Sequence, residues 1–162
     1  MGTGETILYS ERDDDQHMAG VALILKKGLK KALIEWQPVN ERLKRARFNG
    51  KHTKLSIAQC YAPTNDAGDE DKDAFYRRLQ EEIDNVPAYD VLCVMGDMNA
   101  KVQDNSTNQE RAVGNHGCGV LNDDGERLSN FCLEEPYFLT RLFTSSHGCH
   151  QTERLKIRLT MC

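Results

Sequence analysis

The sequence predicts an α/β fold, because strand-like and helix-like segments alternate along its central part. A helix is indicated by apolar residues that recur at intervals of three or four: Phe75, Leu79, Ile83 and Val86. We expect this amphipathic helix over about residues 71–86, with acidic residues opening it and Pro87 ending it. The apolar run at 91–95 follows and is typical of a strand buried on both faces.

A further strand and a hairpin precede the helix. Residues 20–25 form a short apolar run that predicts a buried strand. Residues 45–48 and 55–61 alternate polar and apolar side chains, and the Asn49-Gly50 pair between them is a strong turn signal. We therefore expect these two runs to pair as an antiparallel hairpin.

The second half of the chain is less regular. Residues 101–124 are polar and glycine-rich, which indicates a long loop of the kind that is usually functional or disordered. Residues 125–135 can form a second helix with apolar residues on one face. The pattern ends after Phe143, and residues 153–162 are expected to be a mixed basic tail with no clear partner.

The bulk properties indicate one globular domain. The chain has 162 residues, a net charge of -4 and an isoelectric point of about 5.7. This balance does not by itself indicate nucleic-acid binding, and it does not exclude it either, because a nuclease that holds its metal through carboxylates can be acidic overall. No apolar run approaches the roughly 18 residues that span a bilayer, and no secretory signal opens the chain. We therefore expect a nuclear or cytoplasmic protein, not a secreted one, with reduced cysteines.

The first candidate for chemistry is the segment Gly96-Asp97-Met98-Asn99, which ends the predicted strand. Gly96 lets the backbone turn, so Asp97 and Asn99 project at the carboxyl end of the strand, where α/β folds place their ligands. The carboxylate can hold a divalent metal or orient a water, and the amide can bind a phosphate oxygen. The alternative is an ordinary turn in which both side chains satisfy local backbone donors.

The second candidate lies at the end of the predicted hairpin. Tyr61 ends a strand just before Pro63, an arrangement that can point its hydroxyl into a cleft. Taken alone, a tyrosine at this position is more often a residue at the edge of a core. Asn65 follows in the same loop.

Five segments occur in order along the chain: residues 20–25, 59–66, 75–80, 95–102 and 114–126. They include Gln-Cys-Tyr-Ala-Pro-Thr-Asn-Asp and Met-Gly-Asp-Met-Asn-Ala-Lys-Val. Together they resemble the endonuclease/exonuclease/phosphatase superfamily, and most closely the endonuclease domain of RTE-type non-LTR retrotransposons. The resemblance implies a four-layer α/β sandwich, two facing sheets flanked by helices, that is incomplete here. It divides the chain into a partial domain at 1–143 and a divergent C-terminal tail at 144–162.

The resemblance also implies residue roles. Asp97 would position or activate the attacking water and contact the metal, and Asn99 would contact the scissile phosphate. Tyr61 would stabilise the phosphorane-like transition state, and Asn65 is a further phosphate-proximal candidate. The implied cofactor is Mg²⁺, one ion or two, acting as a Lewis acid. The implied partner is DNA.

Parts of the family pattern have no match in this sequence. The family's domain places an asparagine and a metal-binding glutamate upstream of the block that matches residues 3–10, and an Asp-His block near its end. Glu5 falls after that glutamate, and His150 matches at best a histidine upstream of the Asp-His block. The sequence therefore predicts a Mg²⁺-dependent DNA endonuclease domain of retrotransposon origin with impaired activity. The alternative is a non-catalytic, domesticated binding or scaffold remnant.

Two other features of the sequence are better interpreted as ordinary surface turns than as functional sites. The basic run at 26–31 could touch DNA phosphates, although a solvated surface turn is the better prediction. A zinc site could form, but the spacing of its candidate ligands fits no structural zinc pattern, so an incidental turn is favoured. These ligands are His116, Cys118, His147, Cys149 and His150.

Overall fold

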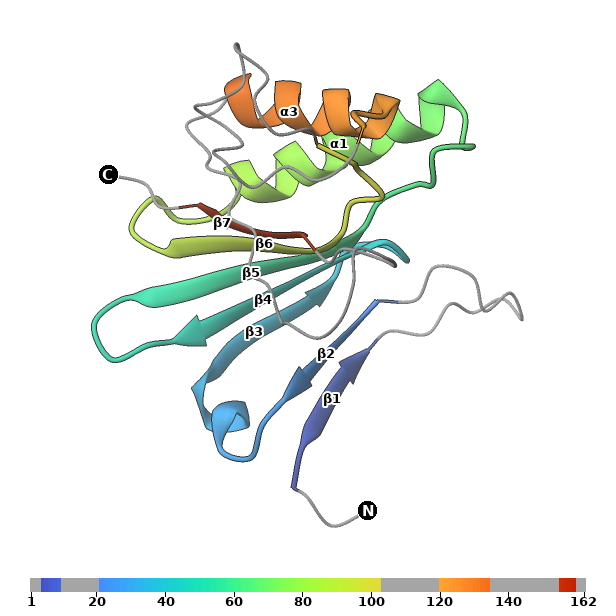
Figure 1. The fold of residues 1–162 in the computed structure, drawn as a ribbon. Helices are drawn as coiled ribbons and strands as arrows, with labels where there is room; N and C mark the ends of the chain where they lie inside the picture. Colours follow the sequence, from blue (N-terminus) through green and yellow to red (C-terminus); the bar gives the residue numbers. More distant parts are fainter. Residues whose placement is uncertain (1–3, 10–20, 103–119, 135–154, 160–162) are drawn as a thin grey trace.

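The structure, a computed structural model, describes residues 4–9, 21–102, 120–134 and 155–159. Its main feature is a five-stranded sheet in the order β3–β4–β5–β6–β7 (Figure 1). Strands β5 and β6 are parallel, and the other neighbours are antiparallel. The strands are β3 (Leu33–Pro38), β4 (Leu43–Asn49), β5 (Lys54–Tyr61), β6 (Val91–Asp97) and β7 (Leu155–Leu159).

Two helices cover one face of this sheet (Figure 1). Helix α1 (Asp69–Asp84) connects the parallel strands, and α3 (Asp123–Glu134) lies beside it. The first turn of α1 is acidic, which the helix dipole favours. The core between the helices and the sheet includes Leu43, Ala58, Cys60, Ala62, Phe75, Leu79, Ile83, Leu92, Val94, Met98, Val102, Leu128 and Cys132.

A second, antiparallel sheet of two strands faces the other side of the large one (Figure 1). It consists of β1 (Thr6–Tyr9) and β2 (Ala22–Leu25), and the short 3-10 helix η1 (Leu29–Ala32) leads from β2 to β3. Leu25 packs with Ala46 and Phe48 of β4 in a second apolar cluster. The described residues thus form layers of helices, large sheet and small sheet, which confirms the predicted α/β architecture with two facing sheets.

Most predicted elements are present with shifted ends. The hairpin pairs Leu43 with Cys60 at one end and Asn49 with Lys54 at the other. Helix α1 begins and ends two residues before the predicted 71–86, and α3 begins at Asp123 instead of 125. Of the predicted loop at 101–124, residues 103–119 lie outside the described part of the chain.

The predicted burial of two strands is corrected by the structure. The strand expected at 91–95 alternates buried with half-buried residues, because the second apolar cluster covers β3, β4 and β5 but includes no residue of β6. The strand expected to be buried at 20–25 exposes Ile24, which faces away from the large sheet. The apolar composition of these two segments could not show that one face of each strand has no further layer packed against it.

The chain near its C-terminus also differs from its prediction. Residues 155–159 form β7 and pair antiparallel with β6, whereas a basic tail with no partner was expected. Their sequence, Leu-Lys-Ile-Arg-Leu, alternates with the period of two that is typical of a strand. No helix in the described part of the chain is long and apolar enough to span a membrane.

Candidate active site

Tyr61 and Asp97 lie side by side at the ends of the two parallel strands. They are register partners in the β5–β6 pair, and the N–H of Ala62 extends the ladder by donating to the Asp97 carbonyl at 2.8 Å. Cys60 and Val94 belong to the core under the helices, and side chains alternate along a strand. Tyr61 and Asp97 therefore both project from the opposite face of the sheet, which is half-open at this end.

Gly96 makes this close pairing of strand ends possible. Its φ is 145°, and an added Cβ would lie 1.7 Å from the carbonyl oxygen of Cys60. Any other residue would push β6 away from β5 just before Asp97. The glycine predicted to turn the backbone thus also permits the close approach of two backbones.

Asn99 is folded back against the strand ends. It has a left-handed φ of 49°, which asparagine tolerates better than most residues. Its backbone N–H donates to Asp97 Oδ1 at 3.0 Å, and its Nδ2 donates to the carbonyl of Ala62 at 2.8 Å. One Asp97 oxygen is therefore used by the local turn, as the alternative interpretation expected. The other carboxylate oxygen has no hydrogen-bond partner among the described residues.

Arg42 is a residue of this site that the sequence prediction missed. Its guanidinium carbon lies 5.8 Å from the centroid of the Tyr61 ring, within the range of a cation–π contact. The Tyr61 N–H also donates to the Arg42 carbonyl at 2.9 Å. Arg42 Nη1 is buried and has no hydrogen-bond partner in the described chain. Arg42 therefore fixes the ring and adds positive charge beside it.

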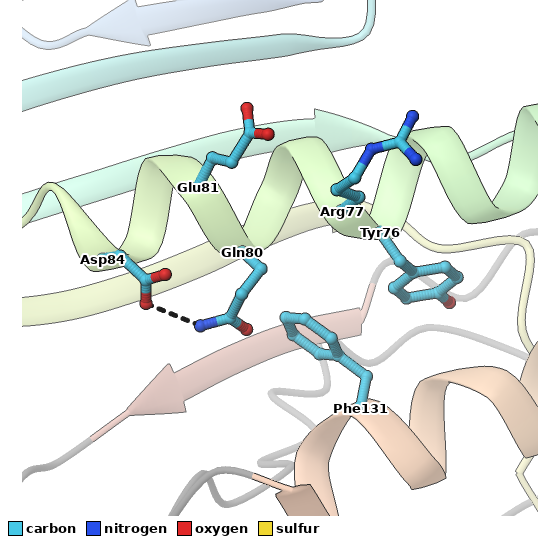
Figure 2. A pocket seen from close by; sticks show the side chains of 6 residues that line it. All are labelled: Tyr76, Arg77, Gln80, Glu81, Asp84 and Phe131. Carbon is cyan, nitrogen blue, oxygen red and sulfur yellow. Dashed lines mark hydrogen bonds between the residues drawn. The ribbon is translucent and has the colours of Figure 1, made fainter.

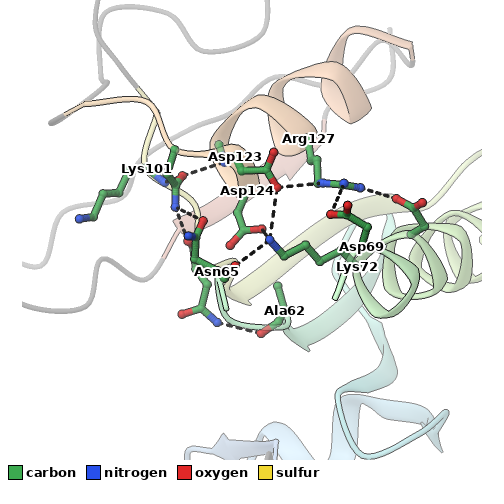
Figure 3. Close-up of polar contacts among 12 residues, drawn as sticks. Ala62, Asn65, Asp69, Lys72, Lys101, Asp123, Asp124 and Arg127 are labelled. Carbon is green, nitrogen blue, oxygen red and sulfur yellow. Dashed lines mark hydrogen bonds and ion pairs between the residues drawn. The ribbon is translucent and has the colours of Figure 1, made fainter. Parts of the chain in front are cut away.

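Asn65 joins the site through a polar network at the start of the helices (Figure 3). Its carbonyl accepts from Lys72 Nζ at 3.0 Å, and its Oδ1 accepts a long hydrogen bond of 3.5 Å from Asn122 Nδ2. Lys72 is only 3% exposed and pairs with Asp124 at 3.0 Å and Asp123 at 3.2 Å. The hydrogen bond to Asp124 is the largest cause that raises the pKa of Lys72, so the buried amine stays charged.

The same network ties the two helices to each other. Arg127 of α3 pairs with Asp69 at 2.8 Å, with Asp123 at 3.3 Å and with Asp73 (Figure 3). Lys72 and Arg127 thus pair with all four carboxylates of this acidic cluster and offset half of their charge. We interpret the cluster as a clamp between α1 and α3, not as a cation site.

The described residues do not complete a Mg²⁺ site. Mg²⁺ prefers several oxygen ligands in near-octahedral geometry, and Asp97 offers one carboxylate. Within the described ranges, no three His, Cys, Asp or Glu side chains gather in a way that could hold a metal ion. The histidines and cysteines of the alternative zinc site lie outside those ranges.

A shallow groove runs between α1 and α3, on the helix side of the sheet (Figure 2). It is lined by Tyr76, Arg77, Gln80, Glu81, Asp84 and Phe131. The Tyr76 and Phe131 rings pack with centroids 5.5 Å apart, and Gln80 Nε2 donates to Asp84 Oδ1 at 2.7 Å. Burial raises the pKa of Tyr76, which disfavours an ionised phenol there. This groove contains none of the residues predicted for the site.

Comparison with known proteins gives relatives for most of the chain. No family model matches it. The chain is 40% identical over 121 residues to craniofacial development protein 2 of Bos taurus, and 39% identical over 113 residues to that of Tragulus javanicus. The matches cover 75% and 70% of this chain but 20% and 19% of those proteins, so the chain spans about a fifth of their length.

Two solved structures share the fold. The endonuclease domain of TRAS1, a telomere-specific non-LTR retrotransposon, is similar with a TM-score of 0.60 at 14% identity, covering 96% of this chain and 65% of that one. An endonuclease/exonuclease/phosphatase family protein from Leptotrichia buccalis C-1013-b gives 0.50 at 16% identity, with 98% and 59% covered. The chain therefore shares the α/β sandwich fold of endonuclease/exonuclease/phosphatase proteins, and over most of its length it is similar in sequence to craniofacial development protein 2.

Proposed function

We propose that this chain is a Mg²⁺-dependent DNA endonuclease domain of retrotransposon origin, with impaired activity as it stands. The observation that supports this most is the pairing of Tyr61 with Asp97 at the strand ends, with Asn99 folded against both. The endonuclease domain of a telomere-specific non-LTR retrotransposon shares this fold. A protein acting on DNA would work in the nucleus or the cytoplasm.

The geometry suits phosphodiester hydrolysis by water. The Asp97 oxygen without a partner can orient or activate the attacking water. One N–H of the Asn99 amide is held by Ala62, and its second N–H can donate to a phosphate oxygen. The Tyr61 hydroxyl can donate to charge that develops in the transition state. Asn65, exposed in the adjoining loop, is the further phosphate-proximal candidate.

Mg²⁺ is the cofactor implied by the family likeness, and Asp97 is the described residue that would contact it. Because the described residues do not complete its ligand set, we assign no catalytic step to the metal. A catalytic set acts as a unit, and the loss of one member can remove most of the rate. We therefore expect the chain to bind DNA but to hydrolyse it poorly.

Two measurements on the purified chain test this proposal. The first is binding of a DNA duplex in the presence of EDTA, and the second is plasmid nicking with Mg²⁺. Asp97→Ala is compared with Asp71→Ala, which removes an exposed carboxylate on α1. We expect binding, together with weak nicking that Asp97→Ala abolishes and Asp71→Ala leaves in place.

The other outcomes separate the alternatives. Absence of DNA binding would refute a DNA-directed domain. Binding with no nicking above the Asp97→Ala background would favour the non-catalytic remnant. Rapid nicking that depends on Asp97 would show that the residues present suffice, and the proposed impairment would be wrong.

A further inference from the structure

Asn122 connects three segments of the candidate site. It immediately precedes α3, and its side-chain Oδ1 accepts from the backbone N–H of Gly125 at 2.8 Å, which is the hydrogen bond of a helix N-cap. The same oxygen accepts from the backbone N–H of Lys101 at 2.7 Å. On the other side, Nδ2 donates to the carbonyl of Asn99 at 3.2 Å and to Asn65 Oδ1 at 3.5 Å.

The orientation of the Asn122 amide is fixed by these partners. Two N–H donors face its oxygen, and two acceptor oxygens face its nitrogen, so a flipped amide would lose all four contacts. The close packing of the α3 N-terminus keeps the amide in place. A Cβ on Gly125 would lie 1.9 Å from the Lys101 carbonyl, so only glycine lets α3 sit this near the loop after β6.

The Asn122 amide nitrogen contacts Asn99, a residue of the site with a constrained backbone conformation. Asn99 is in the left-handed region, which costs free energy for a residue with a side chain and is sustained by its surroundings. Its N–H and Nδ2 are held by Asp97 and Ala62, and its carbonyl is held by Asn122. Without the last contact, nothing else among the described residues bonds that carbonyl.

We infer that Asn122 is a positioning residue of the site: through Nδ2 it sets the conformation of Asn99 and ties the Asn65 loop to it, while through Oδ1 it caps α3. This inference rests on the proposed function, because it assigns Asn99 and Asn65 to phosphate contacts. The two halves of the amide thus have separable tasks, one at the site and one in the helix.

Replacement of Asn122 by aspartate separates these tasks. Asn122→Asp keeps an oxygen for the N–H groups of Lys101 and Gly125, and a carboxylate at an N-cap is favoured by the helix dipole. It replaces the donor nitrogen with a second oxygen that repels the Asn99 carbonyl and Asn65 Oδ1. The matched control is Asn130→Asp, the same change of group and charge at an exposed position of α3.

Three readouts test the inference: thermal unfolding, the ¹H–¹⁵N resonances of the Asn99 backbone and side-chain amides, and affinity for a DNA duplex in EDTA. Asn122→Asp should unfold at the wild-type temperature, shift or broaden both Asn99 resonances, and weaken DNA binding about tenfold relative to Asn130→Asp, the effect of about one charge-assisted hydrogen bond. Asn122→Ala should show the same changes at Asn99 together with a lower Tm.

Unchanged Asn99 resonances and unchanged affinity in Asn122→Asp would overturn the inference, as would a Tm that falls as far as that of Asn122→Ala. Failure of the proposed function has a different signature. If the wild-type chain and Asn130→Asp do not bind DNA, while Asn122→Asp still shifts the Asn99 resonances, Asn122 positions the turn and the DNA-directed function is wrong.

Discussion

Gly96 stands between the buried part of β6 and the side chain of Asp97. Its positive φ and its contact with the Cys60 carbonyl leave no room for a Cβ. Gly68 differs, because it precedes α1 with a φ of -64° and nothing lies within 4 Å of its added Cβ. The two glycines therefore form a natural comparison between a required and a replaceable position.

Gly96→Ala should lower the free energy of unfolding by about 2–5 kcal/mol, through overpacking against β5 and a strained φ. Gly68→Ala should change it by less than about 1 kcal/mol. Urea unfolding measures both. Equal midpoints for the two variants would contradict the close approach of β5 and β6 at this point.

Asp90 gives the molecule a pH-dependent contact. The carboxylate is buried and accepts from Arg47 Nε at 2.7 Å, from Arg47 Nη2 at 2.9 Å and from Ser56 Oγ at 2.8 Å. The Arg47 hydrogen bonds are the largest cause and hold the pKa of Asp90 below its usual value; burial opposes them and Ser56 assists. Since the folded pKa lies below the unfolded one, this stabilisation is complete above the unfolded pKa.

We expect Asp90→Asn to lower Tm by several degrees at pH 7. The difference in Tm from wild type should narrow as the pH falls below about 4, near the unfolded pKa of aspartate, because the unfolded wild-type chain then binds a proton at Asp90 while the folded chain keeps the carboxylate ionised. Thermal unfolding from pH 7 to pH 2.5 measures this difference, with Asp71→Asn as the exposed control. A difference in Tm between wild type and Asp90→Asn that stays constant over this pH range would argue against the Asp90–Arg47 ion pair as its cause.

The site residues that were predicted differ from those that were missed in how far the local sequence shows their position. Asp97, Asn99 and Tyr61 follow apolar strands, so local sequence could place them at strand ends. Arg42 could not be placed in this way, because the predicted turn at Asn49-Gly50 implies another register than the observed one, which pairs Asn49 with Lys54 and brings Arg42 to Tyr61. Asn122 and Lys72 could not be predicted from the local sequence, because their partners come from segments that only the tertiary fold brings together.

At the scale of elements, the spacing of apolar residues in the sequence is enough to predict which face of α1 is buried. Phe75, Leu79 and Ile83 are all buried against the large sheet, as the period of the sequence predicted. The helix begins earlier than predicted because Asp69 and Glu70 occupy its first turn, where negative charge is favoured. Periodicity thus fixed the face of the helix better than its ends.

Leu79→Ala should destabilise the protein by about 2–5 kcal/mol, because it leaves a cavity between α1 and the sheet at a fully buried position. Arg77→Ala, on the exposed side of the same helix, is the control and should cost less than about 1 kcal/mol. Chemical denaturation distinguishes them. A Leu79→Ala variant as stable as Arg77→Ala would mean that this face does not pack as described.

Among the described elements, the sequence analysis missed the short 3-10 helix η1 and three strands, β1, β3 and β7. β1 is only four residues long, β3 carries mixed polar and apolar residues, and β7 alternates basic with apolar ones. Such patterns are weak in a short segment, and pairing with a distant partner decides the outcome. β7 illustrates this, because its partner β6 lies far upstream in the chain.

For the molecule as far as the structure describes it, the outer side of the small sheet groups several exposed apolar side chains. Ile7 and Ile24 are register partners and are 57% and 63% exposed, with Tyr9 beside them at 58%. The inner side of the same hairpin packs Leu8 and Leu23 against the second apolar cluster. Exposed apolar groups on a two-stranded sheet favour self-association.

Ile24→Lys should therefore reduce self-association of the purified chain, with Tm unchanged. Leu23→Lys, one residue away on the packed side, should lower Tm because it buries a charge. Light scattering against concentration, with thermal unfolding alongside, separates the two effects. Equal scattering from wild type and Ile24→Lys would show that this surface does not drive association.

Tyr61 and Asp97 belong to one continuous stretch, β5–α1–β6, whereas β7 reaches β6 from far along the chain. The entropy lost in closing a loop grows with the length of the chain that it encloses, so nearby pairings form ahead of distant ones. The parallel unit is therefore expected to assemble early, with β7 added later. The two side chains would then meet while the sheet is still unfinished, and the frame of the site would be among the first parts of the native structure to exist.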